Sequence, residues 1–336
     1  MPALEIIPVQ SRAERRQFFN LPWDLYRGDP HWVPPLRIVK KELLNFKRHP
    51  FYDDAEVRHF LARREGRPVG RIAAIINHAH NRWYREQRGF FGFFESVDDA
   101  EVSGGLFDAA RGWLGERGIE ALRGPVNPSL NYEVGLLVEG FDDAPWFMMT
   151  YNKPYYERLF DQYGFRKAQD LYAFWGHLSM LEEVTQRLGA LSQGVLERFQ
   201  LNCRPMNVRR FNEEIKTFLD IYNRSLVNTW GFVPMSDGEV KKQAAGMRYM
   251  IVPELTTIAE ADGQAIGTMF GLLDYNPRIK AIDGRLLPLG FWKLLRNRRE
   301  LKRIRLISTN VLPEFQSWGI GIALVGRLVP DAMAWG

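Results

Sequence analysis

The sequence has little cysteine and no long apolar run, and these two absences exclude several classes of protein. Cys203 is the only cysteine among the 336 residues, which excludes an internal disulfide and a multi-cysteine zinc site. No run reaches the roughly 18 consecutive apolar residues that a membrane span needs. The N-terminal residues also lack the apolar core of a signal peptide. We therefore expect a cytoplasmic protein that does not cross a bilayer.

The chain is nevertheless long and hydrophobic enough to form more than one core. Its 336 residues, 46% of them hydrophobic, predict two domains. The net charge of +5 is unevenly placed, since seven basic residues and one acidic residue lie between Lys293 and Arg305. Because the basicity is local, the sequence argues against a long nucleic-acid-binding surface.

Hairpin signals recur in the two halves of the chain and predict an internal duplication. Gly66-x-x-x-Gly70 lies between strand-like runs, and the same spacing returns in Gly263-x-x-x-Gly267. In each half a further strand pattern and a helix pattern follow, and a strand from Leu171 to Gly176 is expected to finish the first copy. These elements predict an α+β fold on a mixed sheet.

The stretch after the second hairpin has the pattern of an anion-binding loop. A β-branched run ending at Thr309 is followed by Gly319, Gly321 and an apolar helical pattern. Glycines at alternate positions let backbone N–H groups and a helix N-terminus converge on a phosphate, although an ordinary strand-to-helix turn can have the same spacing. The corresponding segment of the first copy, 98–102, is acidic and lacks the paired glycines. We therefore expect the phosphate loop in the second copy.

A second unusual segment, residues 124–142, combines several polar side chains with an apolar run. Asn127, Asn131 and Glu133 lie close together in the chain, directly before Leu136 and Leu137. Polar groups beside a core segment must be hydrogen-bonded or functional. The structural alternative is a turn whose Asn and Ser side chains satisfy its own backbone.

Five motifs together indicate one family. They are Gly124-Pro125-x-Asn127-x-Ser129-x-Asn131-x-Glu133-x-Gly135-Leu136-Leu137, Gly140-Phe141-Asp142, Met148-Met149-x-x-Asn152-x-Pro154-Tyr155-Tyr156, Trp230-Gly231-Phe232-Val233-Pro234 and Val311-x-Pro313-x-x-Gln316-x-x-Gly319-x-Gly321. The chain resembles the GNAT acyltransferases, and within them the bacterial group that includes the ceramide synthases. Those enzymes are acyl-CoA-dependent N-acyltransferases that act on long-chain amino lipids.

The resemblance implies tandem GNAT domains that use acyl-CoA as a co-substrate. Residues 1–178 are expected to form a domain without a glycine-rich coenzyme loop, and 179–206 a helical linker. Residues 207–336 are expected to form a GNAT domain with that loop, truncated at its C-terminus because the last strands of the family fold are missing. The linker helix carries an apolar stripe made of Leu181, Val184, Leu188, Leu191, Val195 and Phe199.

The resemblance also assigns roles to residues. The GNAT closing helix often carries a tyrosine that acts as general acid, which matches Tyr155 or Tyr156. Acyl transfer to an amine needs a base for the ammonium proton, and Glu133 is the only carboxylate in the Asn- and Ser-containing part of this segment, residues 124–135. Asn127 and Asn131 are expected to orient the amine. The expected pyrophosphate loop of coenzyme A consists of Val311, Gln316, Ser317, Trp318, Gly319, Ile320, Gly321 and Ile322.

Two other functions stay open beside transfer to a small-molecule or lipid amine. Paired GNAT-like domains also serve aminoacyl-tRNA-dependent transfer, although such enzymes do not need a coenzyme loop. A non-catalytic acyl-CoA-binding protein would keep the loop without turnover. The sequence does not specify the acyl length, the acceptor or the oligomeric state.

The basic segment 286–305 has the composition of an interfacial membrane anchor, with apolar and aromatic residues beside lysines and arginines. It predicts docking on an anionic membrane surface, and so a peripheral location on the inner membrane face. The alternative is an amphipathic lid with a solvated basic face. His78 and His80 lack a nearby cysteine or further ligand cluster, so no metal is expected.

Overall fold

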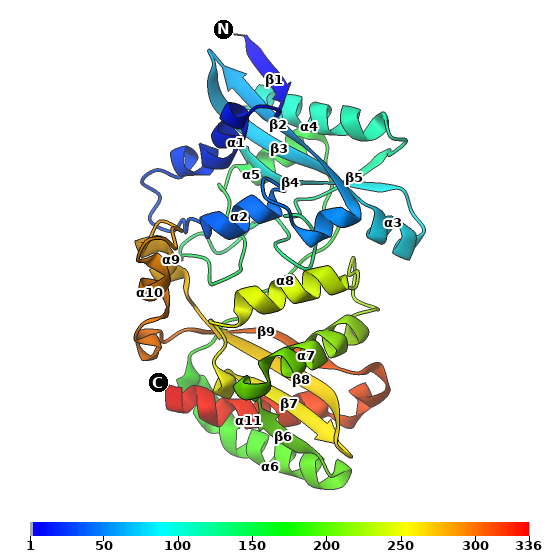
Figure 1. Ribbon diagram of the computed structural model, residues 1–336, viewed down its shortest axis with the longest axis vertical. Helices are drawn as coiled ribbons and strands as arrows, with labels where there is room; N and C mark the ends of the chain where they lie inside the picture. Colours follow the sequence, from blue (N-terminus) through cyan, green and yellow to red (C-terminus); the bar gives the residue numbers. More distant parts are fainter. Residues whose placement is uncertain (1–2, 336) are drawn as a thin grey trace. The chain divides into compact units, whose positions relative to one another are not determined.

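The computed structural model describes residues 3–335, apart from the side chains of Leu178 and of residues 181–186. The chain forms two compact units (Figure 1). Unit 1 comprises the residues up to Leu171 together with Asn276–Phe291, and unit 2 comprises Tyr172–Tyr275 and the residues from Trp292 onward.

Unit 1 contains a five-stranded mixed sheet with strand order β1-β2-β3-β4-β5. Neighbouring strands are antiparallel except β4 and β5, which are parallel. Helices α4 and α5 pack on one face of the sheet, and α1 and α2 pack on the other. The elements are β1 (Leu4–Pro8), α1 (Arg12–Leu25), α2 (Arg37–Leu43), β2 (Ala55–Arg64), β3 (Arg67–Asn77), α3 (His78–Tyr84), β4 (Arg88–Ser96), α4 (Ala100–Gly115), β5 (Ala121–Arg123), α5 (Tyr156–Tyr163) and α9 (Asn276–Ala281).

Unit 2 contains a four-stranded antiparallel sheet with strand order β6-β7-β8-β9. Helix α11 packs on β7 and β8 and against α6, while α7 packs on β8 and β9. The elements are α6 (Glu182–Phe199), β6 (Asn202–Pro205), α7 (Phe211–Ser225), α8 (Asp237–Met247), β7 (Thr256–Ala261), β8 (Gln264–Leu273), β9 (Ile304–Val311) and α11 (Ile320–Trp335). The short helix α10 (Gly290–Leu295) contains the point where the chain leaves unit 1.

The two units repeat one arrangement of strands and helix. The hairpin β2-β3 with β4 and α4 corresponds to the hairpin β7-β8 with β9 and α11 (Figure 1). Both hairpins turn through two residues with positive φ, Glu65-Gly66 in unit 1 and Asp262-Gly263 in unit 2, as tight hairpin turns require. The predicted α+β class, its mixed sheet and its duplication are confirmed.

The units divide the chain differently from the predicted ranges 1–178, 179–206 and 207–336, because residues 276–291 belong to unit 1. Asp283 holds this segment, accepting hydrogen bonds from Trp23 Nε1 and from Arg37 Nη2, each at 2.6 Å. Such pairings are invisible in the sequence since the partners lie far apart in the chain.

The predicted linker 179–206 is part of unit 2. Its helix α6 packs on α11, where a Cβ on Gly326 would lie 2.4 Å from Ser192 Oγ. Leu191 of the predicted apolar stripe is 57% exposed, so the buried face is rotated toward Ser192. The side chains of Leu181 and Val184 lie outside the described residues.

The predicted strand from Leu171 to Gly176 has no regular secondary structure. Tyr172, Phe174 and Trp175 expose 79%, 92% and 81% of their surface. The apolar alternation that predicted a strand therefore lacks the neighbouring strand that would bury it.

The predicted surface segment 286–305 is only partly on the surface. Leu287 and Leu289 are 83% and 63% exposed, whereas Leu294 is 2% exposed. Burial lowers the pKa of Arg305, which lies in β9. Arg298 is half-buried and donates to Ile251 O, whereas Lys293, Arg296, Arg299, Lys302 and Arg303 are exposed.

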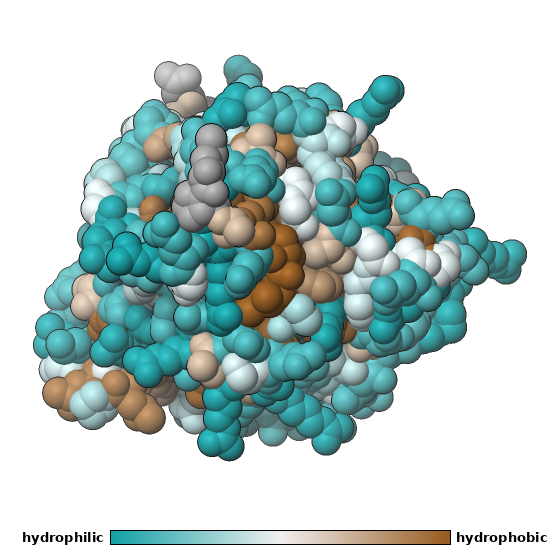
Figure 2. All heavy atoms as spheres, turned by 90° about the horizontal axis from the view of Figure 1, so that it is seen from above, coloured by the Kyte–Doolittle hydropathy of each residue, from teal (hydrophilic) through white to brown (hydrophobic). Residues whose placement is uncertain are grey.

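Hydrophilic residues cover most of the face seen in Figure 2, and hydrophobic residues gather there in a few places. Across the described residues, every helix is too short or too polar to cross a membrane.

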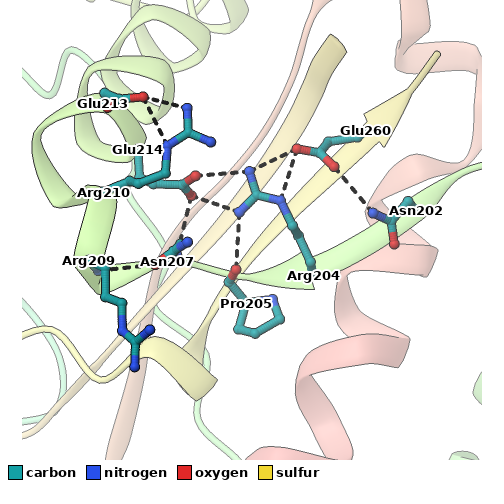
Figure 3. Close-up of polar contacts among 9 residues, drawn as sticks. All are labelled: Asn202, Arg204, Pro205, Asn207, Arg209, Arg210, Glu213, Glu214 and Glu260. Atoms are coloured by element: carbon teal, nitrogen blue, oxygen red, sulfur yellow. Dashed lines mark hydrogen bonds and ion pairs between the residues drawn. The ribbon is translucent and has the colours of Figure 1, made fainter. Parts of the chain in front are cut away.

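One arginine joins three elements of unit 2. Arg204 of β6 donates from Nη1 and Nη2 to the two carboxylate oxygens of Glu214 in α7, at 2.8 and 2.9 Å (Figure 3). Its Nε also donates to Glu260 of β7, at 2.9 Å. These bonds raise the pKa of Arg204, and Glu214 is only 5% exposed. The arginine therefore neutralises a carboxylate that water barely reaches.

We expect Arg204→Met to lower the free energy of unfolding of unit 2 by about 3 kcal/mol, because it leaves the Glu214 charge buried and unpaired. Arg210→Met is the matched control, since Arg210 pairs with Glu213 on the exposed side of α7, and it should cost less than about 1 kcal/mol (Figure 3). Urea denaturation, monitored by hydrogen exchange of the α7 and β7 amides, measures the loss of stability in both variants. Equal losses would show that the Arg204 network does not hold these elements.

Candidate active site

The polar segment after β5 lies directly on β4. Val126 N donates to Phe91 O at 2.9 Å, and the segment closes on itself where Asn127 N donates to Glu133 O at 2.7 Å. A Cβ on Gly92 would lie 1.6 Å from Val126 O, so only glycine permits this approach. The segment 124–135 is thus a closed loop whose position is set by the backbone of β4.

A β-bulge next to Gly92 turns the following residues of β4. The pairing of β3 with β4 shifts between Arg71 and Ala73, and Phe93 has a φ of 50°. The Asn127 side-chain oxygen accepts a hydrogen bond from Phe93 N. Bulges commonly re-aim side chains near active sites. Here Phe93, Phe94 and Glu95 all line one cavity.

This cavity has a volume of about 50 Å³ and lies entirely within unit 1. Two carboxylates, Glu95 and Glu133, and two cations, Lys40 and Arg71, take part in its wall. The remaining lining residues are Phe93, Phe94, Pro125, Asn127, Gly135, Leu136, Thr150, Tyr151, Asn152, Tyr156 and Phe160. A volume of this size has room for a small polar group.

Glu133 pairs with a lysine from helix α2. Lys40 Nζ lies 3.0 Å from Glu133 Oε2 and also 4.9 Å from the centre of the Phe93 ring. Among the described residues, Lys40 is the donor recorded for this carboxylate, and it contacts one of the two oxygens. The second oxygen is therefore able to accept a proton or a hydrogen bond from a ligand.

Glu95, in β4, belongs to a buried polar cluster. Its Oε2 accepts from the hydroxyls of Tyr26 and Tyr156, at 3.0 and 2.8 Å. Arg71, directly across in β3, lies 3.5 Å from Oε1. Burial raises the pKa of Glu95, opposed by the positive charge of Arg71, and burial lowers the pKa of Arg71. The cluster thus keeps two charges out of water.

The structure brings together three of the five residues predicted for catalysis. Glu133, Asn127 and Tyr156 line the cavity, whereas Asn131 and Tyr155 are not part of its wall. Asn127 serves the bulge through its side-chain oxygen, and the Tyr155 hydroxyl donates to Ser96 O at 2.8 Å. Burial raises the pKa of Tyr155 and of Tyr156 above the usual value of a phenol.

Sequence reasoning missed Lys40, Arg71, Glu95 and Tyr26. Arg71 and Glu95 did leave a signal, because each is a charged residue inside an otherwise apolar strand pattern and their signs are opposite. Lys40 and Tyr26 lie in helix and turn segments rich in polar residues, where nothing distinguishes them.

The predicted coenzyme loop lies in unit 2 between β9 and α11. A 3₁₀ helix covers Pro313–Trp318, Gly319 has a φ of 74°, and α11 begins at Ile320. Leu312 and Ile320 are fully buried and anchor the two ends of the loop. The loop is therefore a strand, a tight turn and a 16-residue helix, as the pattern predicts.

The loop has the features that a phosphate requires. The amides of Ile320 and Gly321 open α11, where N–H groups have no earlier helical carbonyl to bond. A Cβ on Gly321 would meet nothing within 4 Å, so space adjoins the helix end. Gln316 and Ser317 are exposed, and Gln316 Nε2 donates to Val311 O at 3.1 Å. Trp318 stacks on Phe199 at 4.4 Å, while Ile322 is exposed on the first turn.

The two histidines that follow β3 have carboxylate partners. His78 lies 3.1 Å from Glu56, and His80 lies 2.7 Å from Glu86. In the part of the chain that the structure describes, no group of three or more His, Cys, Asp or Glu side chains is arranged to hold a metal ion.

Known proteins resemble the chain over most of its length. It is 35% identical over 333 residues to the bacterial ceramide synthase of Caulobacter vibrioides (strain NA1000 / CB15N), covering 97% of this chain and 84% of that protein. It is 34% identical over 285 residues to protein YghO of Escherichia coli (strain K12), covering 85% and 72%. No protein-family model matches the chain.

A solved structure supports the fold. The chain superposes with a TM-score of 0.51 and 12% identity on a fungal multi-domain GH3 beta-N-acetylglucosaminidase that contains a GCN5-related glucosamine N-acetyltransferase region. The superposition covers 99% of this chain and 34% of the fungal protein. At this identity the likeness concerns the fold alone.

Sequence identity and fold lead to the same assignment. Two relatives exceed 30% identity over more than two thirds of their own length, and the tandem α+β units match a GNAT-containing structure. The chain belongs to the tandem GNAT acyltransferase family that includes the bacterial ceramide synthase.

Proposed function

We propose that the protein is an acyl-CoA-dependent N-acyltransferase whose acceptor is the amine of a long-chain lipid. The single observation that carries this proposal is the position of Glu133 in the polar cavity of unit 1, with one carboxylate oxygen left for a ligand. The name of the Caulobacter relative supports a lipid acceptor. The cavity fits a polar head group, and the chain of such a lipid would remain outside it.

In this mechanism Glu133 accepts a proton from the acceptor ammonium. The resulting amine nitrogen attacks the thioester carbon, a C–N bond forms and the C–S bond breaks. The nitrogen then gives its second proton to the departing thiolate, so coenzyme A leaves as the thiol. Asn127 stays occupied at the Phe93 bulge and so keeps the Glu133 loop in place. The hydroxyls of Tyr155 and Tyr156 already donate to Ser96 O and Glu95 Oε2, so the proposal assigns Tyr156 to the cavity wall and Tyr155 to its support.

Coenzyme A is proposed to bind unit 2 through the loop after β9. Its pyrophosphate would contact the amides of Gly319, Ile320 and Gly321, with Gln316 and Ser317 at the exposed rim. Val311, Trp318 and Ile322 frame this loop, and Trp318 fixes it against Phe199.

A non-catalytic acyl-CoA-binding protein is the second candidate. The Lys40–Glu133 ion pair favours it, because a base engaged by a lysine must exchange that partner for the acceptor ammonium. Turnover with an amine acceptor separates the two functions.

We expect Glu133→Gln to lower turnover by at least about 100-fold while acyl-CoA affinity is retained, because the amide keeps the size of the carboxylate but does not accept the proton. Glu139→Gln is the matched control, since Glu139 is an exposed carboxylate of the same segment. Steady-state kinetics with a long-chain amine measures both. Normal turnover by Glu133→Gln would contradict the role of this residue.

We expect Gly321→Glu to weaken acyl-CoA binding at least tenfold, because it places a carboxylate at the start of α11, beside the proposed phosphates. Gly321→Ala is the control, since a methyl group there meets no atom within 4 Å and should leave affinity unchanged. Calorimetric titration with acyl-CoA decides, and unchanged affinity in a folded Gly321→Glu variant would remove the loop from the proposal.

We also propose that segment 286–305 docks on an anionic lipid surface, which would place the protein beside a lipid acceptor. Leu287, Leu289 and Trp292 are 83%, 63% and 59% exposed, and Lys293 and Lys302 are exposed cations of the same segment. Apolar side chains next to basic ones are typical of interfacial anchors.

We expect co-sedimentation with vesicles of anionic phospholipid at low salt, and its loss at high salt because each basic residue contributes about 1 kcal/mol of screened attraction. Changing Leu287, Leu289, Lys293 and Lys302 to Ser should abolish binding. The control changes Lys216 and Lys241, exposed lysines of unit 2 outside the segment, to Ser and should keep binding. Failure of the parent protein to bind would contradict the docking proposal.

A further inference from the structure

Arg71 is a buried arginine that the mechanism above does not use. Its side chain is 2% exposed, and it lines the same cavity as Glu133. Nη1 donates to Phe18 O at 2.7 Å, and Nη2 lies 3.5 Å from Glu95 Oε1, the upper limit of a hydrogen bond. The Phe18 ring also faces the guanidinium, and Arg71 Cζ lies 5.0 Å from the centre of this ring.

These contacts leave much of the guanidinium unsatisfied. An arginine carries five N–H donors. Among the described residues Arg71 makes the two hydrogen bonds just given, and its Nε is a buried atom without a hydrogen-bond partner. A buried donor without an acceptor is costly, and Arg71 is the one residue with such an atom, among those that the structure describes, that also lines the cavity. An acceptor atom inside the cavity would remove this cost.

The neighbouring groups limit what that acceptor can be. Glu95, Tyr156, Tyr26 and Glu133 are the ionisable groups whose charges act on Arg71. Tyr26 and Tyr156 already donate to Glu95, so Arg71 is the buried donor of this cluster with capacity to spare. A guanidinium in this position binds an oxygen, not an ammonium or an alkyl group.

We propose that Arg71 donates a hydrogen bond to an oxygen atom in the head group of the acceptor. This inference rests on the proposed function, since it takes the ligand of the cavity to be the amine acceptor. Glu133 and Arg71 both line this cavity, so the acceptor nitrogen and this oxygen belong to one head group. Arg71 is thereby a residue that determines acceptor specificity, with Glu133 on the nitrogen.

Three probes of one chain length test this role: 2-aminooctane, 2-amino-1-octanol and 2-aminooctanoic acid. The first has no oxygen, the second has a hydroxyl and the third a carboxylate. Binding to the whole chain is measured by calorimetry and by ligand-induced change in Tm, and acyl transfer to each probe is measured in parallel.

Arg71→Met removes the donors and leaves Glu95 without its counter-charge, so the double variant Arg71→Met with Glu95→Gln is the version expected to fold normally. Arg88→Met is the control. Arg88, the first residue of β4, pairs with Glu86, and neither residue lines the cavity.

We expect the parent protein and Arg88→Met to bind one of the oxygen-bearing amines at least about tenfold more tightly than 2-aminooctane. The double variant should lose this preference while still binding 2-aminooctane. Preference for the alcohol or for the acid identifies the oxygen. No preference in the parent, or a preference that survives in the double variant, overturns the inference.

The measurements separate this inference from the proposed function. A preference that depends on Arg71, without acyl transfer to any probe, would keep the inference and reject the acyltransferase proposal for these amines. Transfer that is equally efficient with all three probes would keep the proposed function and remove the role of Arg71.

Discussion

The candidate site depends on a backbone contact that leaves no room for a side chain. A Cβ on Gly92 would lie 1.6 Å from Val126 O, and a Cβ on Gly124 would lie 2.4 Å from Phe91 O. Two glycines therefore let the loop 124–135 lie against β4. The bulge at Phe93 follows at once, and Asn127 supplies the acceptor for its N–H. Without this contact, Glu133 and Glu95 would not share a cavity.

The cavity combines two carboxylates with two cations in a small volume. Glu133 pairs with Lys40, and Glu95 lies across from Arg71. Burying charges is costly unless they are paired, so each pair supports the other by keeping the site neutral. The pairs differ in separation, which is 3.0 Å for Lys40 and Glu133 and 3.5 Å for Arg71 and Glu95. The looser pair is the one whose arginine retains unused donors.

Local signals predicted the elements well, and long-range contacts account for what they missed. Both hairpins formed as predicted, because each depends on residues near one another in the chain. The pairing of Lys40 with Glu133 and the docking of Asp283 on unit 1 join residues distant in sequence. The run after Leu171 alternates like a strand, yet a strand needs a partner that alternation alone does not specify.

The two copies retain different halves of a common arrangement. In unit 1, Gly70 pairs with Ser96 and Arg71 with Glu95, whereas the same register in unit 2 pairs Gly267 with Val311 and Thr268 with Asn310.

The charged pair of unit 1 is therefore replaced by two neutral residues in unit 2. Asn310 is 1% exposed and bonds to Ser225 and Ser308, which closes that position to a ligand. Conversely, the helix that follows β4 begins at the acidic cap Asp99, while the helix that follows β9 begins directly after Gly319. A carboxylate at a helix N-terminus satisfies the same amides that would otherwise bind phosphate. Unit 1 thus has the charged cavity, and unit 2 has the helix end at which we propose that phosphate binds.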